Sequence, residues 1–185
     1  LNNMNLKVKT MLEWKSEGEE PEILFWVGSA GSFDDRAKKI TRSFVKVLNQ
    51  ANVKFGVLGI EESASGDIAK RAGNEFLFQM QAMTNIEILN SYNIKRIVTT
   101  CPHDFNTIKN EYKELGGDYD VVHHTEFIYE LINKNQLSVS DNGKLKKITY
   151  HDPCYLSRGN DVIDIPRKLI NKMGMSGIFD SNNYL

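Results

Sequence analysis

Side chains that could bind a metal gather in the stretch CPHDFN at residues 101–106. Pro102 suits the first position of a helix, so the stretch predicts a helix with Cys101 as its N-cap and Asp104 as its third residue. A thiol at a helix N-terminus has a lowered pKa, which favours the thiolate that ligates metals. The alternative is structural, because Asp in the first helical turn stabilises the dipole by roughly 0.3–1 kcal/mol. A lone Cys is also commonly a small buried side chain. The stretch indicates either part of a metal site or a well-capped helix.

Four histidines enlarge the donor set: His103, His123, His124 and His151. With the two cysteines and Asp104 they could supply a mixed zinc site, and our candidate zinc ligands are Cys101, His103, Asp104 and His124. Their spacing matches no compact zinc pattern, and histidines at strand ends are often structural. As a nucleophile, Cys101 would need His103 or His124 as its base and a third group to orient it. The sequence shows no such signature.

The elements that would position these residues alternate along the chain. Apolar runs at 23–28, 53–58, 95–100, 119–124 and 146–151 predict strands, and the segments between them predict helices. This alternation is typical of an α/β fold with a parallel sheet flanked by helices. Ligands of such a sheet bind where loops leave the carboxyl ends of the strands. Every polar cluster lies on such a loop, at 28–32, 61–67, 101–104, 123–124 or 151–154.

Two of the predicted helices have an apolar face. The first starts near Asp34, with Ser32 and Asp35 as a capping pattern. The residues predicted on its apolar face are Ala37, Ile40, Phe44, Val47 and Leu48. The second runs from about Asp67 to Leu89. The residues predicted on its buried side are Ile68, Ala72, Phe76, Met80 and Met83.

The overall composition excludes several classes of protein. A formal net charge of −1 and a pI near 6.5 give no basic excess, so we expect no nucleic-acid partner. No window approaches the roughly 18 apolar residues of a membrane-spanning helix, and the first residues contain no signal-peptide core. We therefore expect a cytoplasmic protein with no direct membrane span. Two cysteines, Cys101 and Cys154, do not make a disulfide framework.

Several segments taken together resemble a known family. They are FWVGSAGSFDDRAKKITRSFVKVLNQANVKFGVLGIEES, GDIAKRAGNEFLFQMQA, IVTTCPHDFNTIKNEY, VVHHTEF and YHDPCYLSR. They are similar to the cysteine-rich (CCG) domain of heterodisulfide reductase B-type subunits and of the iron–sulfur subunits of glycolate oxidase and lactate utilisation. The resemblance covers about residues 23–170. It implies a Rossmann-like α/β unit that binds an iron–sulfur cluster at one edge. It also implies electron transfer with a flavoprotein or ferredoxin-like oxidoreductase subunit.

Most positions that the resemblance marks as cluster ligands carry other residues here. Cys101 and Cys154 are the remaining family ligands. The replaced positions are Ser29 (in VGCAG), Ala64 and Ser65 (in CC or CT before Gly66), and Asp104 (in CPHC). Clusters are normally held by four thiolates, whereas a serine hydroxyl is a poor ligand and Asp suits Mg²⁺, Ca²⁺ or a weak zinc site. We therefore expect this chain to hold no stable cluster.

The predicted organisation has three parts. Residues 1–22 are a leader and linker with one short helical pattern at residues 10–17, residues 23–140 a first CCG-like α/β domain, and residues 141–185 the beginning of a truncated second CCG-like domain. When Cys154 is aligned with Ser29, a strand, a loop and a helix of the two segments correspond, which indicates a tandem copy.

Three functional hypotheses follow from these observations. The first is an electron-transfer CCG-type subunit of a heterodisulfide reductase-like oxidoreductase, inactive as this chain alone. The second is a non-catalytic α/β module that docks a partner subunit, and the third is a mixed Cys/His/Asp zinc site.

Overall fold

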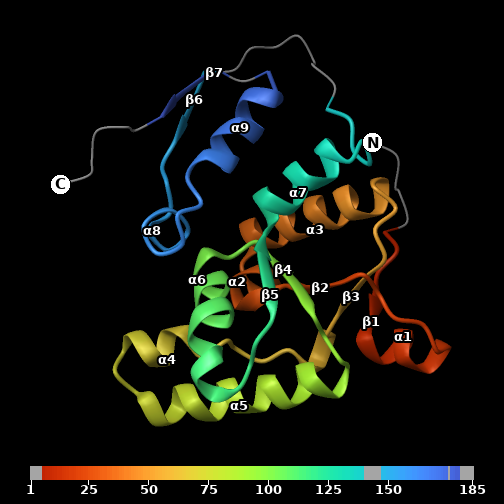
Figure 1. The fold of residues 1–185 in the computed structure, drawn as a ribbon, viewed down its shortest axis with the longest axis vertical. Helices are drawn as coiled ribbons and strands as arrows, with labels where there is room; N and C mark the ends of the chain where they lie inside the picture. Colours follow the sequence, from red (N-terminus) through yellow and green to blue (C-terminus); the bar gives the residue numbers. More distant parts are fainter. Residues whose placement is uncertain (1–5, 140–146, 175, 180–185) are drawn as a thin grey trace. The chain divides into compact units, whose positions relative to one another are not determined.

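The computed structural model describes residues 6–139, 147–174 and 176–179, and the chain divides into two compact units, Leu1–His124 and Thr125–Leu185 (Figure 1). The elements of the first unit are β1 (Lys9–Thr10), α1 (Met11–Glu17), β2 (Ile23–Trp26), α2 (Gly28–Phe33), α3 (Asp35–Gln50), β3 (Phe55–Val57), η1 (Gly59–Glu61), α4 (Asp67–Arg71), α5 (Glu75–Ser91), β4 (Arg96–Thr99), α6 (Pro102–Asn106), the π-helix η2 (Thr107–Glu111), η3 (Tyr112–Leu115) and β5 (Asp120–His123).

The first unit is built on a parallel sheet with the strand order β1-β3-β2-β4-β5. The chain leaves the central strand β2 for β3 on one side and then crosses back to β4 on the other. This reversal makes the carboxyl ends of β2 and β4 the topological switch point, where open α/β sheets bind ligands. The register pairs Trp26 with Thr99, so the residues after these two strands emerge side by side. The predicted α/β fold with a parallel sheet and flanking helices is confirmed.

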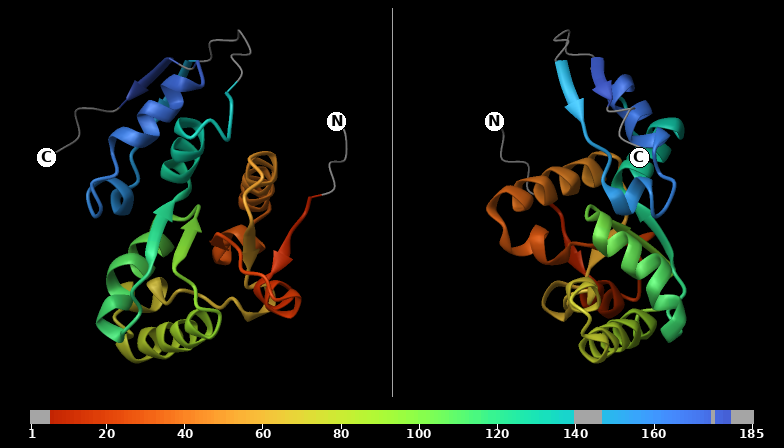
Figure 2. Two further views of the ribbon diagram at one scale, coloured as in Figure 1. Left: turned by 45° about the vertical axis from the view of Figure 1, so that its right-hand side comes forward. Right: turned by 90° about the vertical axis from the view of Figure 1, so that its left-hand side faces the viewer.

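Helices cover both faces of this sheet (Figures 1 and 2). On one face, the ring of Phe25 in β2 packs edge-on against Phe44 in α3, with 5.0 Å between ring centroids. On the other face, Phe105 of α6 packs against His123 of β5, at 5.9 Å. Opposite faces are expected, because right-handed crossovers that run in opposite directions place their helices on opposite sides of the sheet. The predicted burial of Phe44 and Leu48 is confirmed, whereas Ala37 and Val47 are half-buried and Ile40 is 49% exposed. Asp34 rather than Ser32 caps α3.

Residues predicted as a leader and linker contribute to the sheet instead. Strand β1 pairs in parallel with β3, and Thr10 and Glu13 form a capping box at the start of α1. Trp14 is buried and its indole Nε1 donates to the carbonyl of Phe55 at 2.9 Å. The predicted helix at residues 10–17 is confirmed as α1. The apolar content of this short segment was too small to indicate that it packs against the sheet beside an edge strand.

The predicted helix from Asp67 to Leu89 is two helices. The chain breaks at Gly73, where φ is +77°, and Asn74 restarts the helix by accepting a hydrogen bond from the N–H of Leu77 at 3.1 Å. The predicted buried face was wrong for both helices. Ile68, Phe76, Met80 and Met83 are 52–80% exposed. The face that packs on the sheet side consists of Phe78, Ala82, Ile86 and Leu89.

The second unit contains a parallel β-α-β arrangement. Its elements are α7 (His124–Asn133, whose first residue belongs to the first unit), β6 (Lys147–Tyr150), α8 (Cys154–Ser157), α9 (Asp164–Lys172) and β7 (Ser176–Phe179). Strands β6 and β7 pair in parallel, as β2 and β3 do, and each pair is separated by a short and a longer helix. A tandem duplication itself stays a prediction. Within the described ranges, no helix is both long and apolar enough to cross a bilayer.

Candidate functional site

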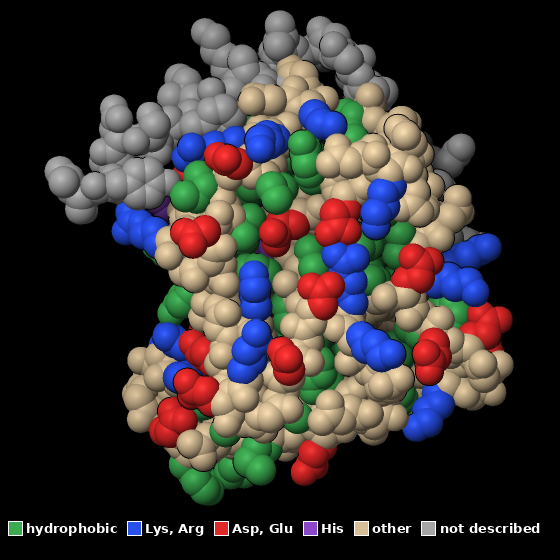
Figure 3. Space-filling view, in the orientation of Figure 1, with side chains coloured by type: hydrophobic (Ala, Val, Ile, Leu, Met, Phe, Trp, Pro, Cys, Tyr) green, Lys and Arg blue, Asp and Glu red, His purple; other side chains and the backbone are tan. Residues whose placement is uncertain are grey.

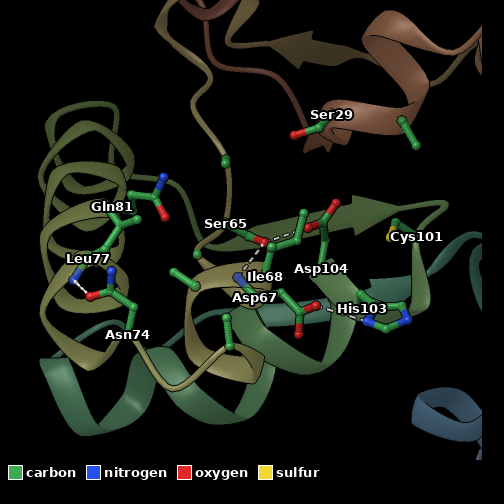
Figure 4. A pocket seen from close by; sticks show the side chains of 15 residues that line it. Ser29, Ser65, Asp67, Ile68, Asn74, Leu77, Gln81, Cys101, His103 and Asp104 are labelled. Carbon is green, nitrogen blue, oxygen red and sulfur yellow. Dashed lines mark hydrogen bonds and ion pairs between the residues drawn. The ribbon is translucent and has the colours of Figure 1, made fainter.

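A pocket of about 630 Å³ opens at the switch point of the first unit (Figure 4). The loops after β2, β3 and β4 form its walls together with α4 and α5. Its lining includes five residues that we call the five family positions: Ser29, Ala64, Ser65, Cys101 and Asp104. The structure therefore brings together, from three loops, all the replaced positions and the one remaining thiol of the first domain.

The loop after β2 is fitted closely against two acidic side chains. Gly28 begins α2 with φ +76°, and a Cβ at this position would collide with a carboxyl oxygen of Asp104. The carboxylate of Glu62 accepts hydrogen bonds from the N–H groups of Val27 at 3.0 Å and Gly28 at 2.6 Å. Glu62 thereby ties the loop after β3 to the start of α2.

Buried hydrogen bonds hold the loop after β3 in place. The side-chain amide of Asn85 donates to the carbonyl of Ala64 at 3.0 Å, and the hydroxyl of Tyr112 donates to the carbonyl of Ser65 at 2.9 Å. Gly66 follows with φ +88°, and a Cβ there would lie 2.8 Å from the ring of Phe78. This glycine is required both by the backbone conformation and by the close approach.

The loop after β4 adopts the predicted helix start. Cys101 is the N-cap of α6, with Pro102 as the first residue and Asp104 in the first turn. Asp104 is only 9% exposed, and its Oδ1 accepts a hydrogen bond from the hydroxyl of Ser65 at 2.6 Å. A direct hydrogen bond thus joins Ser65 and Asp104, two of the five family positions.

The ionisation of Cys101 differs from our expectation of a lowered pKa. Burial raises the pKa of the Cys101 thiol to about 11, and the neighbouring carboxyl of Asp104 contributes in the same direction. These effects outweigh the hydrogen bonds from the backbone at the start of α6. Burial also raises the pKa of Asp104 and raises that of Glu62 to about 7. At neutral pH Cys101 is therefore a thiol rather than a thiolate.

His103 lies at the pocket beside an acidic residue that the sequence did not single out. Nδ1 of His103 is 2.9 Å from Oδ2 of Asp67, whose other oxygen accepts from the hydroxyl of Thr107 at 3.2 Å. Asp67 supplies the orienting group that a Cys–His pair would need. The raised pKa of Cys101 still argues against a nucleophile. Glu62 and Asp67 flank the loop that contains Ala64 and Ser65. In the sequence, these two carboxylates beside a predicted ligand loop were the feature that could have pointed to acidic residues at the pocket.

The remaining candidate residues are not among those that line this pocket. His124 packs against Phe44 and against His123, whose ring centroid is 4.3 Å from its own. Burial lowers the pKa of His123 to about 3 and that of His124 to about 4. Cys154 is exposed at the start of α8 in the second unit, three residues after the exposed His151. Of the predicted zinc ligands, Cys101, His103 and Asp104 line the pocket and His124 does not.

The donor chemistry of the pocket does not fit an iron–sulfur cluster. Cluster iron needs thiolate ligands, and the five family positions offer one protonated thiol, two hydroxyls, one methyl group and one carboxyl group. A hydroxyl and a carboxyl are already bonded to each other through Ser65 and Asp104. Nor do the described residues contain a group of three or more His, Cys, Asp or Glu side chains arranged to hold a metal ion.

The parallel sheet and the loops at its switch point define an α/β domain with a ligand site at the carboxyl edge of its strands. The family model of the cysteine-rich domain, CCG, matches residues 23–109. Cys101 is the only cysteine within the matched residues. The resemblance identified from the motifs is therefore confirmed, over residues that contain a single cysteine.

Relatives with curated names are iron–sulfur proteins and oxidoreductases. The probable iron-sulfur-binding oxidoreductase FadF of Bacillus subtilis strain 168 is 47% identical over 89% of this chain and 23% of the relative. The EtfAB:quinone oxidoreductase of Syntrophomonas wolfei is 44% identical over 85% of this chain and 22% of the relative. A subunit of the dihydromethanophenazine:CoB–CoM heterodisulfide reductase of Methanosarcina mazei is 28% identical, over 83% of this chain and 38% of the relative. The chain thus spans less than a quarter of the first two relatives. No solved structure matches it significantly.

Proposed function

We propose that this chain is part of a CCG-type electron-transfer iron–sulfur oxidoreductase, and that its own pocket holds no stable cluster. The observation that carries the proposal is the convergence of the five family positions on one pocket in which Cys101 is the only thiol. The scaffold of a cluster site is present, whereas its donors are not. Without a cluster this pocket could not carry electrons itself, so electron transfer would have to go through another part of the protein.

The names of the relatives support the oxidoreductase class. Two of them are called oxidoreductases and a third a heterodisulfide reductase subunit. By the same reasoning we propose a flavoprotein or a ferredoxin-like subunit as the partner. The activity of the whole protein, its acceptor and a cytoplasmic location are proposals of the same kind.

Restoring the missing thiols tests the proposal. The variant carries Ser29→Cys, Ala64→Cys, Ser65→Cys and Asp104→Cys, and the control carries four exposed substitutions, Ser16→Cys, Ser32→Cys, Ser43→Cys and Ser91→Cys. After anaerobic reconstitution with iron and sulfide, we expect a protein-bound cluster only in the restored variant. Equal iron and acid-labile sulfide in the restored variant and the control would show that the pocket is not a converted cluster site.

A second candidate function is docking of a partner subunit, and one surface favours it. Helix α5 has apolar residues on two faces, and the outer one is formed by Phe76 (75% exposed), Met80 (52%) and Met83 (52%), which we call the α5 outer face. These residues follow one another at helical spacing. Figure 3 shows hydrophobic side chains gathered at its lower edge, over α5. Exposed apolar patches of this kind mark interaction sites.

A charge placed on the α5 outer face tests docking. With the proposed flavoprotein subunit as the partner, Met80→Glu should weaken binding by roughly tenfold or more, because a buried charge must be desolvated. Leu12→Glu, at an exposed apolar residue of α1 (61%), is the matched control and should bind as the unmodified chain does. Docking independent of redox chemistry also requires Cys101→Ser to bind normally. Equal weakening by Met80→Glu and Leu12→Glu would contradict a specific surface.

A further inference from the structure

The pocket has the size and the walls of a small-molecule site. Its volume of about 630 Å³ lies within the roughly 300–1,000 Å³ that is usual for such sites. Much of the wall is apolar and is formed by Ala30, Ala64, Ile68, Ala72 and Leu77. An apolar wall around a few polar groups is the arrangement that binds the body of an organic molecule and orients one end of it.

Polar groups reach this space from different walls. Figure 4 shows Ser29 and Gln81 directed toward the cavity from opposite walls, with the carboxyl group of Asp104 below Ser29. One oxygen of Asp104 is held by Ser65 at 2.6 Å, and the other lies toward Gly28 at the start of α2. A ligand group that donates hydrogen bonds and lies beside Asp104 would meet its carboxyl oxygens there.

The charges of the pocket select among ligands. Among the described residues that line it, His103 is the only side chain that can carry a positive charge, and Asp67 contacts its Nδ1. Asp67 is also paired with Arg71, whose Nε lies at 3.4 Å. Asp104, by contrast, takes part in no ion pair within the described part of the chain. Glu62 lies behind it, at the N–H groups of Val27 and Gly28, and adds negative charge in its ionised form, above its raised pKa of about 7. Anionic ligands are disfavoured here and a cation is favoured.

We propose that this pocket binds a small organic molecule with an apolar body and a protonated amine, whose ammonium group donates to the carboxylate of Asp104. The inference rests on the proposed function in one respect, since the space is available only when no cluster fills it. The apolar wall would contribute affinity through burial of the body, and Asp104 would determine the choice of head group. The pocket would then be a former cluster site converted to an organic ligand.

Three probes with the same apolar body test the choice of head group. Phenethylamine, phenethyl alcohol and hydrocinnamate carry a benzene ring on a two-carbon chain that ends in an ammonium, a hydroxyl or a carboxylate. Titration calorimetry on the full chain, after its iron content has been measured, should give the tightest binding for phenethylamine and the weakest for hydrocinnamate. Binding of hydrocinnamate as tight as that of phenethylamine, or no binding of phenethylamine, would overturn the inference.

Variants assign the effect to the pocket. Asp104→Asn keeps the shape of the side chain and removes its charge, so phenethylamine should bind about tenfold or more weakly and phenethyl alcohol nearly as before. Asp118→Asn, an exposed position outside the pocket, is the control and should leave both unchanged. Ala72→Phe, at an exposed position in the lining, should block all probes, and it also serves if Asp104→Asn fails to fold. Unaltered phenethylamine binding in Asp104→Asn or in Ala72→Phe would overturn the inference.

The two proposals fail in distinguishable ways. Stoichiometric iron and sulfide in the unmodified chain would contradict the proposed function. An iron-free chain that does not bind phenethylamine would contradict the ligand inference alone.

Discussion

The chemistry of the pocket depends on the relation between Cys101 and Asp104. Position 104 lies in the first turn of α6, and its carboxyl group is held by Ser65 at 2.6 Å. Asp104 therefore stabilises the neighbouring loop and at the same time raises the pKa of the thiol beside it. A residue that favours the neutral thiol makes Cys101 a poor ligand and a poor nucleophile.

Titration of Cys101 tests this account at the level of the residue. In a Cys154→Ser background Cys101 is the single thiol, and its thiolate absorbance should develop only near pH 11. Asp104→Asn should lower the pKa, because a nearby negative charge disfavours the thiolate. Burial is the larger cause, so the pKa should stay above that of a free thiol. The reactivity toward iodoacetamide should rise in parallel.

A matched substitution separates charge from packing in this titration. Asp118→Asn removes a carboxylate that pairs with Lys113 at 3.5 Å on the surface and should not change the titration of Cys101. A thiolate already formed at neutral pH in the unmodified chain would contradict the account.

At the scale of elements, the sequence predicted the strands well and the burial of the helices less well. The predicted strands correspond to β2–β6 and rest on short apolar runs, which are typical of a buried parallel sheet. β1 (Lys9–Thr10) and β7 (Ser176–Phe179) are not such runs and were not predicted. Helix α5 is apolar on two faces, so periodicity alone could not decide between Phe76 and Phe78 as the buried ring. The turn at Gly73 ends the apolar periodicity of α4, so α5 starts with a different face toward the sheet and buries Phe78 rather than Phe76.

The candidate site was predictable in part for a physical reason. Loops at the carboxyl edge of neighbouring strands converge, so Ser29, Ser65 and Cys101 were expected together and lie together. Loops that leave other strands need not reach the same point, and His124 packs on Phe44 instead. The raised pKa of Cys101 depends on burial and on the position of Asp104 in space, which the sequence does not give.

Two glycines with the same backbone conformation test how tightly the loop after β3 is packed. Gly66 and Gly73 have φ of +88° and +77°, but only at Gly66 does a Cβ meet a neighbour, the ring of Phe78 at 2.8 Å. Both substitutions to Ala carry the cost of a left-handed backbone, on the order of 1–2 kcal/mol. Gly66→Ala should cost roughly 1–3 kcal/mol more because of overpacking. Urea denaturation of both variants measures the difference, and equal losses would contradict the close packing.

At the scale of the whole molecule, the chain forms two compact units and spans only part of the length of its relatives. It spans 23% of the FadF relative and 22% of the quinone oxidoreductase relative. In the second unit β6, α8, α9 and β7 follow one another as β2, α2, α3 and β3 do in the first, and its only cysteine, Cys154, lies at the start of α8. The electron-transfer role is therefore proposed for the protein as a whole, and the absence of a cluster is proposed for the first unit.

The most direct test is the stoichiometry of iron and acid-labile sulfide in the unmodified chain, purified and reconstituted without oxygen. One thiol among the five family positions cannot hold a cluster, so we expect well under one iron atom per chain and no charge-transfer absorption. Iron and sulfide in stoichiometric amounts would contradict the central claim and would require ligands other than the five family positions.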